Sequence, residues 1–247
     1  MLTLSFRLSK LRFEFNIGFA VLVLAVCAVM LRAGYWQLDR AAEKIRMQQQ
    51  IEEAQIQPVL HIFGDLPAPE SLRYRQIRIT GYYRNEHQFL LDNKVRSDSA
   101  GAARVGYHVI TPFVTDAGTL LVDRGWVALG MDRNRLPEVA VDTGERNITG
   151  TVTLPERGFH LGAIDSDWNW PRLIQFVDYE LLGHRLDSRI YPATIVLAAG
   201  SEDAYEYDWR PTQAGPQKHY SYATQWFLMC GAMVVLFIWF SARRIET

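Results

Sequence analysis

Two apolar runs enclose a longer segment of mixed polarity. Neither residues 17–31 nor residues 227–240 contain a charged, amide or hydroxyl side chain. A helix needs about 20 predominantly apolar residues to cross a bilayer, and the interfacial residues beside each run extend it to that length. The pattern therefore predicts membrane-spanning helices over residues 17–36 and 219–240.

The first run also has the general form of a signal peptide. A signal peptide normally has a shorter apolar core, followed by small residues at its cleavage site. Here the run continues into Arg32-Ala-Gly-Tyr-Trp36, which is typical of a membrane interface because Arg and aromatic side chains gather at that depth. We therefore expect an uncleaved helix.

Between the two runs the periodicity changes twice. Residues 33–57 are rich in helix-forming side chains and stop before Pro58, which predicts that the first helix continues as a solvated stalk. From Leu72 onward, short segments of alternating polarity predict about six β-strands, and their short connections favour antiparallel pairing. The expected strands are 72–80, 87–91, 106–114, 119–127, 148–154 and 193–198, with a short helix over 173–182.

A few residues set the expected boundaries and partners of these elements. Gly81 is expected to end the first strand and Asp92-Asn93 the second. Pro112 predicts an edge strand or a bulge, because it has no N–H for a sheet ladder. In the stalk, Glu43 and Arg46 have the i, i+3 spacing of a helical ion pair.

Charge at the two ends predicts the orientation. Three basic residues precede the first helix and two follow the second; they are Arg7, Lys10, Arg12, Arg243 and Arg244. Because positive charge favours the cytoplasmic side, both termini are expected in the cytoplasm. The protein is then expected in the inner membrane of a bacterium, with the segment between the helices in the periplasm. A mitochondrial membrane is the alternative, although the basic leader is short for a transit peptide.

The expected fold class is therefore an α+β membrane protein. Two transmembrane helices bracket one β-rich, mostly antiparallel extracytoplasmic domain with one or two helices of its own. The expected boundaries are 1–16 for a cytoplasmic N-terminal segment, 17–36 for the first membrane helix, 37–218 for the stalk and external domain, 219–240 for the second membrane helix and 241–247 for a cytoplasmic tail.

Composition excludes several kinds of function. The formal net charge is −1, and no run of Lys and Arg marks a nucleic-acid surface. The only two cysteines, Cys27 and Cys230, lie in the apolar runs, so the external domain has no disulfide, cysteine zinc site or thiolate nucleophile. The lack of thiols there also disfavours copper delivery. No hydrolase, zinc-protease or nucleotide-binding motif occurs, and we expect no enzymatic activity.

His219 is the principal candidate for chemistry. In a helix, His219, Tyr222, Ala223 and Trp226 share one face. A neutral imidazole can bind haem iron, and the aromatic surface below can cover a flat macrocycle. A histidine among Tyr and Trp is also ordinary in an interfacial belt, so both interpretations stay open. The basic residues available for carboxylates are Lys218, Arg210 and Arg32.

The segment Asp123-Arg-Gly-Trp126 lies in a strongly predicted strand. Arg124 can be interpreted as an anion-binding side chain. The interpretation we favour is an ion pair with Asp123 at a strand end, with Trp126 in the core.

Several motif blocks together resemble the surfeit-locus-protein-one (Surf-one) family of cytochrome oxidase assembly factors. The blocks are Gly34-Tyr-Trp-Gln37 with Arg40 and Lys44, Tyr74-Arg75 with Gly81, GYHVITPF at 106–113, LVDRGWV at 121–127, and His219-x-x-Tyr222-Ala223-x-x-Trp226-Phe227. They cover nearly the whole chain in the family's order. Residues 201–217 depart from the pattern, being longer and more acidic.

The resemblance implies a non-catalytic factor that assists insertion of haem a into subunit I of cytochrome c oxidase. It implies transient binding of haem a at His219, beside Tyr222 and Trp226, and contact with haem a synthase and the lipid bilayer. Further candidates for partner or propionate contacts are Trp36, Gln37, Arg40, Arg124, Trp126 and Arg210. The alternative is a cofactor-free membrane scaffold that stabilises an oxidase assembly intermediate.

Overall fold

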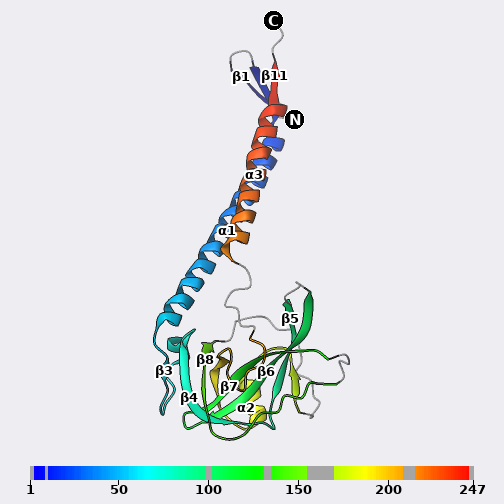
Figure 1. The fold of residues 1–247 in the computed structure, drawn as a ribbon. Helices are drawn as coiled ribbons and strands as arrows, with labels where there is room; N and C mark the ends of the chain where they lie inside the picture. The colour runs from blue at the N-terminus through cyan, green and yellow to red at the C-terminus, as the bar shows by residue number, and fades with distance from the viewer. Residues whose placement is uncertain are drawn as a thin grey trace. The chain divides into compact units, whose positions relative to one another are not determined.

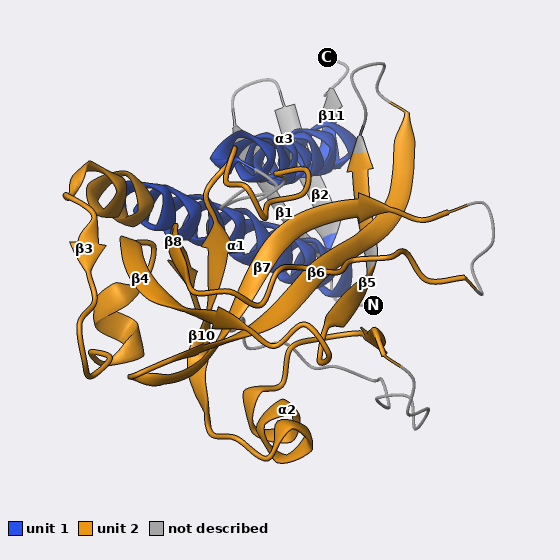
Figure 2. Cartoon of the chain, turned by 60° about the horizontal axis from the view of Figure 1, so that its bottom comes forward, with its two compact units in different colours: residues 1–49, 212–247 blue, residues 50–211 orange. Residues whose placement is uncertain are grey.

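The chain divides into two compact units (Figure 2). Unit 1 comprises Met1–Gln49 and Thr212–Thr247, and unit 2 comprises Gln50–Pro211. The computed structural model describes residues 3–8, 11–97, 102–130, 135–154, 170–207 and 215–244. The expected fold class is confirmed, because two apolar helices bracket a β-rich domain with few helices.

Two helices form most of unit 1: α1 (Ile17–Ile56), whose last turns belong to unit 2, and α3 (Pro216–Ser241) (Figure 1). Both are long and apolar enough to cross a membrane. α1 is unbroken for 40 residues, so the predicted stalk continues the apolar helix. It ends two residues before Pro58, whose ring disfavours helical backbone at the preceding residue.

α1 and α3 run antiparallel along a narrow seam. Near one end, the rings of Phe19 and Phe237 lie 5.9 Å apart, and further along Cys230 Sγ lies 3.9 Å from the carbonyl oxygen of Cys27. Buried and half-buried positions recur at alternating steps of three and four residues, which is the spacing of a coiled-coil seam. They include Val23, Cys27, Met30, Gly34, Gln37 and Ala41 on α1, and His219, Ala223, Trp226, Cys230, Met233 and Phe237 on α3.

A small sheet joins the segments that flank the two helices. β1 (Thr3–Leu8) pairs with β2 (Leu11–Asn16), and β2 pairs with β11 (Ala242–Arg244) (Figure 1). The sequence pattern predicted no strand in residues 1–16 or 241–247; β1 and β2 pair locally, whereas β11 finds its partner at the other end of the chain. The pairing holds both flanking segments at the same end of the helix pair.

Unit 2 is built on one sheet of eight strands in the order β3-β4-β8-β10-β7-β6-β5-β9. The strands are β3 (Leu60–His61), β4 (Gln76–Tyr83), β5 (Phe89–Ser97), β6 (Ala103–Thr115), β7 (Gly118–Ala128), β8 (Arg146–Thr153), β9 (Arg172–Ile174) and β10 (Ile190–Leu197). A 3-10 turn, η1 (Pro69–Leu72), precedes β4, and α2 (Tyr179–Leu186) precedes β10. Most pairs are antiparallel, but β3–β4, β5–β9 and β7–β10 are parallel.

An additional pairing of β4 with β6 closes five of these strands into a barrel. All five strands contribute to one cluster of buried apolar side chains, which includes Ile79, Phe113, Val122, Val152 and Ile195. This cluster fills the barrel, since alternate residues of a strand point to one face. On the other face of β6 and β7, α2 packs through Leu182 and Leu186 in a second cluster.

Gly81 does not end the first strand, contrary to the sequence-based expectation. β4 continues to Tyr83, and the barrel closes there, with Tyr82 opposite Val114 and Tyr83 opposite Phe113. A Cβ atom at position 81 would lie 2.2 Å from the carbonyl oxygen of Val114. Glycine is therefore required because the β6 backbone approaches β4 at this point.

Two further expectations about strands were wrong. Asp92 and Asn93 do not end β5; they form an irregularity in register between Leu91 and Lys94, after which pairing with β6 resumes. The edge strand expected at Pro112 was wrong, because β6 lies between β5 and β7. The alternative was a bulge, and β6 does shift in register against β7 between His108 and Ile110. Pro112 comes two residues after Ile110, the last β6 residue paired with β5, and its carbonyl accepts a hydrogen bond from the N–H of Arg84.

The helix expected over residues 173–182 begins later. β9 occupies Arg172–Ile174, and α2 starts at Tyr179. Asp178 caps α2 by accepting hydrogen bonds from the N–H groups of Glu180 and Leu181, at 3.1 and 2.9 Å. The preceding residues become a strand because β5 offers them a parallel partner, which no local pattern shows.

Candidate functional site

Two of the motif blocks, 34–37 and 219–227, contact each other within unit 1. His219 Nδ1 lies 2.8 Å from Gln37 Oε1, although 182 positions separate the two residues in the sequence. The ring of Phe227 lies 5.5 Å from that of Tyr35, edge to face. A Cβ atom at Gly34 would lie 2.5 Å from Phe227, so glycine is the residue that admits this ring. The two blocks therefore fasten α1 to α3.

The Gln37 contact favours one neutral tautomer of the His219 imidazole. The amide oxygen of Gln37 has only lone pairs, so it accepts and Nδ1 donates. In the neutral ring, Nε2 then carries a lone pair. Among the described residues, no side chain or backbone group makes a hydrogen bond to Nε2. His219 thus presents an uncommitted nitrogen at the polar end of the helix pair.

The aromatic side chains of this motif block lie on different sides of α3. Tyr222 and Phe227 lie about 140° apart around α3, so they occupy opposite flanks of the seam. Phe227 packs on α1, whereas Tyr222 is 43% exposed. The face expected to be shared by four residues is thus divided: Ala223 is buried in the seam, Trp226 is half-buried, and Tyr222 lies outside the seam.

Arg40 adds a positive charge near this end of α1. Its guanidinium carbon lies 5.7 Å from the centre of the Trp36 ring, which is 46% exposed. Its ion-pair partner is Glu43 at 2.6 Å, so the expected pairing of Glu43 with Arg46 was wrong. The hydrogen bond from Arg40 lowers the pKa of the Glu43 carboxyl, with nearby positive charge acting in the same direction. Trp36 and Arg40 thus form an exposed aromatic and cationic surface on α1.

Arg124 serves unit 2 internally. It is only 4% exposed, and it donates to Gln88 Oε1 and to the carbonyl oxygens of Val139 and Asp203, at 3.1, 2.9 and 2.9 Å. The Tyr205 ring lies 4.9 Å from its guanidinium carbon. A buried guanidinium with these partners holds the loop before β8 and the segment after β10 against the barrel.

Asp123 does not form the expected ion pair with Arg124. Its Oδ2 lies 2.8 Å from His108 Nδ1, and its Oδ1 accepts from the N–H of Gly125. Successive side chains in a strand point to opposite faces, so adjacent residues are poorly placed to pair. Trp126 does lie in the core, as expected, with 1% of its surface exposed and its indole N–H bonded to the Lys94 carbonyl.

The backbone of the same motif binds the segment through which the chain leaves the barrel. The N–H of Trp126 donates to Glu206 at 2.8 Å, and the N–H of Tyr205 donates to the carbonyl of Arg124 at 2.6 Å. Gly125 has φ +108°, and a Cβ atom there would lie 2.8 Å from the Glu206 carbonyl oxygen. Residues 124–126 therefore form a clamp for residues 203–206, a role that the sequence analysis did not assign to them.

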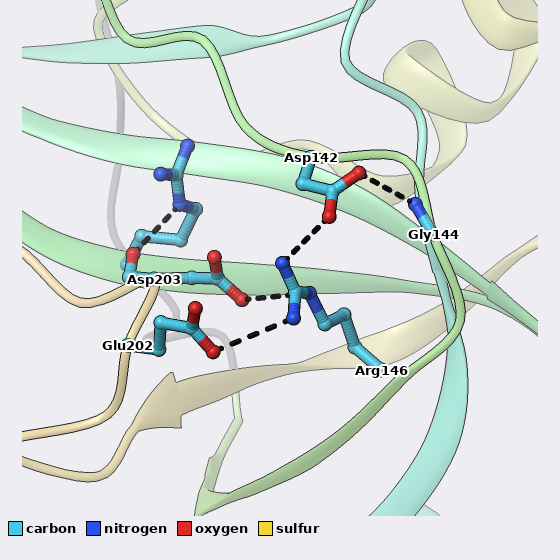
Figure 3. Close-up of polar contacts among 6 residues, drawn as sticks. Asp142, Gly144, Arg146, Glu202 and Asp203 are labelled. Atoms are coloured by element: carbon cyan, nitrogen blue, oxygen red, sulfur yellow. Dashed lines mark hydrogen bonds and ion pairs between the residues drawn. The ribbon is translucent and has the colours of Figure 1, made fainter.

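Arg146 fastens the same segment through charge. It lies among three carboxylates: Asp142 at 2.8 Å, Glu202 at 3.4 Å and Asp203 at 3.8 Å (Figure 3). Two of these acids belong to the acidic stretch that departs from the family pattern. Nearby, burial raises the pKa of the Tyr83 phenol, and the charge of Asp203 adds to the effect. The acidic residues 202 and 203 thus have a structural partner in Arg146.

Arg210 lies outside the described residues. No group of three or more His, Cys, Asp or Glu in the described ranges is placed to hold a metal ion. The contact of Gln37 with His219 was not foreseen, although both residues belong to motif blocks, because the sequence does not give the register between two antiparallel helices.

Gly34→Leu is expected to separate the helix pair. The new side chain must displace Phe227, and overpacking of this kind costs about 1–3 kcal/mol. Oxidative cross-linking of the native pair Cys27 and Cys230, followed by mass spectrometry, should become slower. The matched control is Gly231→Leu on α3, where a Cβ atom would meet nothing within 4 Å. Equal cross-linking rates in the two variants would contradict this role of Gly34.

Arg124→Met is expected to release residues 203–206. It removes the hydrogen bonds of the guanidinium to Gln88 Oε1 and to the carbonyl oxygens of Val139 and Asp203, at a cost of about 3 kcal/mol in the free energy of unfolding. Hydrogen–deuterium exchange at the amides of Tyr205 and Glu206 should accelerate. The exposed Arg135→Met is the control, and unchanged exchange in Arg124→Met would refute the clamp.

The chain is similar to known proteins over most of its length. The model of the SURF1 family matches residues 24–231. A SURF1-like protein of Rickettsia bellii is 25% identical over 237 residues, 91% of this chain and 93% of the relative. A SURF1-like protein of Rickettsia conorii is 23% identical over 90% of each chain. Surfeit locus protein 1 of Mus musculus is 25% identical over 54% of this chain and 47% of its own length. With a family match over most of its length, this chain belongs to the SURF1 family.

Proposed function

We propose that the protein is a non-catalytic assembly factor for a haem–copper oxidase. In this proposal it receives haem a, from haem a synthase as the donor partner, and presents it for insertion into cytochrome c oxidase subunit I. Family membership supports the assembly role. The observation that carries the haem role is the uncommitted Nε2 of a half-buried His219 at the polar end of an apolar helix pair.

The residues around His219 fit the chemistry of a haem. A haem needs an axial donor atom, apolar cover for its ring and cations for its carboxylates, and when bound it supplies a redox-active iron. His219 offers the donor, Tyr222 and Trp226 offer aromatic surface on α3, and Arg40 over Trp36 offers a cation. Arg124 and Trp126 are not part of this proposal, because their side chains are buried inside unit 2.

Two features support the orientation that we propose across the membrane. β2 and β11 pair with each other, so the segments before α1 and after α3 lie on one side of a membrane that the helices cross. These segments carry Arg7, Lys10, Arg12, Arg243 and Arg244, which favours the cytoplasm. Unit 2 and His219 then face the periplasm of a bacterium, with the protein in the inner membrane.

Reporter fusions test this orientation. Green fluorescent protein fused after residue 247 should fluoresce, because it folds in the cytoplasm, and alkaline phosphatase at the same position should be inactive. Alkaline phosphatase fused after residue 211, which removes α3, should be active in the periplasm. The reverse pattern would overturn the assigned orientation.

A cofactor-free scaffold for an oxidase intermediate is the second candidate. Unit 2 exposes Ile56 and Phe63 at 85% and 86%, and large exposed apolar side chains favour contact with a protein partner. A scaffold of this kind binds subunit I without carrying haem. The two candidates therefore differ in whether the purified protein holds haem when haem a is plentiful.

His219→Ala tests the haem role. The wild-type protein, co-expressed with haem a synthase, should co-purify with haem a, and the variant should fall to near background because it has lost the axial ligand. His61→Ala, an exposed histidine of unit 2, is the control and should match the wild type. Equal haem content in the His219 variant would exclude His219 as ligand, and a haem-free wild type that still captures subunit I would establish the scaffold.

A further inference from the structure

We infer that Gln37 is a positioning residue for His219. It holds the imidazole in the tautomer with the proton on Nδ1 and thereby directs the lone pair of Nε2 toward the ligand. This inference rests on the proposed function for its ligand, haem iron. The hydrogen bond itself exists without the ligand and can be measured separately.

Gln37 offers His219 a hydrogen-bond acceptor. An imidazole free in water exchanges between its two neutral tautomers, and only the form with the proton on Nδ1 leaves Nε2 able to bind a metal. Gln37 Oε1 lies 2.8 Å from Nδ1 and can only accept. The contact therefore stabilises the tautomer that is competent to bind at Nε2 and disfavours the other.

The contact with Gln37 also orients the imidazole ring. A histidine that binds a metal typically donates its second ring N–H to a carbonyl or carboxylate, which fixes the ring plane and raises the basicity of the bound nitrogen. Gln37 occupies that position toward His219. The two residues lie on different helices, and Phe227 packed against Gly34 holds those helices together. The ring is thus fixed by the helix pair rather than by its own helix alone.

Gln37 and His219 form a polar pair within a seam of small and apolar residues. The neighbouring seam positions Gly34 and Ala223 are small, and further along the seam Val23, Cys27 and Cys230 form an apolar cluster. An apolar pair would pack in such a seam without needing hydrogen bonds. A polar pair also specifies the register of a coiled-coil seam, and this purely structural role is the alternative that the experiment must separate.

The test begins with the protein free of haem, in detergent micelles. Nitrogen-15 NMR of histidine-labelled protein reports the tautomer of each imidazole, and subtraction of the His219→Ala spectrum identifies His219. The wild type should show the proton on Nδ1. Gln37→Leu, similar in size but without an acceptor, should show a mixture, whereas Gln37→Glu keeps an acceptor and should retain the wild-type form.

The second measurement uses the same proteins loaded with haem. Loss of a hydrogen-bonding partner behind a ligand typically weakens metal binding about 10–100-fold, so haem should dissociate faster from Gln37→Leu by that factor. The iron–histidine stretching band should also move to lower frequency. Gln37→Glu should restore both values, because a carboxylate is the stronger acceptor.

Cross-linking of Cys27 to Cys230 reports whether the helix pair remains intact in each variant. A wild-type tautomer in Gln37→Leu, or a Gln37→Glu protein that behaves like Gln37→Leu, would overturn the inference. If the tautomer and the haem dissociation rate change only in variants whose cross-linking is also slower, Gln37 serves only to set the register of the two helices. That result would also overturn the inference. If wild type and His219→Ala hold haem equally, the proposed function fails and so does the iron-directed part of this inference. If only His219→Ala loses haem while Gln37→Leu equals the wild type, the function stands and the inference alone fails.

Discussion

The structure of unit 1 depends on close contact between two antiparallel helices that come from opposite ends of the chain. Small residues make the contact possible, because Gly34 leaves room for Phe227. The hydrogen bond between Gln37 and His219 then adds a specific polar contact between the two helices. In a membrane, packing and specific polar contacts hold helices together, since lipid tails are as apolar as the helices themselves. The motif blocks at 34–37 and 219–227 therefore join α1 to α3.

In unit 2, too, a sequence motif holds a distant segment of the chain in place. Arg124, Gly125 and Trp126 bind residues 203–206 through side-chain and backbone hydrogen bonds, and Arg146 adds charge. The chain leaves unit 2 from this segment and reaches α3 at residue 216. A buried arginine without a carboxylate partner needs neutral acceptors around it, and Gln88, Val139 and Asp203 supply them. The motif therefore has a structural role, and the side chains of Arg124 and Trp126 are too deeply buried to reach a ligand.

The sequence pattern predicted the elements better than their partners. The two apolar runs and the alternation of Ile77 and Ile79 in β4 were confirmed, because both follow from local spacing. Gly81 and Asp92 were misinterpreted as strand ends, and Pro112 as the sign of an edge strand. Each of these residues lies in a strand that pairs with another strand. Whether a strand continues through such a residue depends on this partner, which is distant in the sequence.

The sequence by itself therefore determined the class of the protein: two membrane-length helices, a β-rich domain without thiols and the motif order of its family. Only the tertiary structure decided which motif residues meet. It placed Gln37 beside His219, and it placed Arg124 inside the barrel. The reason is physical, because periodicity records which face of an element is apolar, whereas the register between elements depends on packing that the local pattern does not encode.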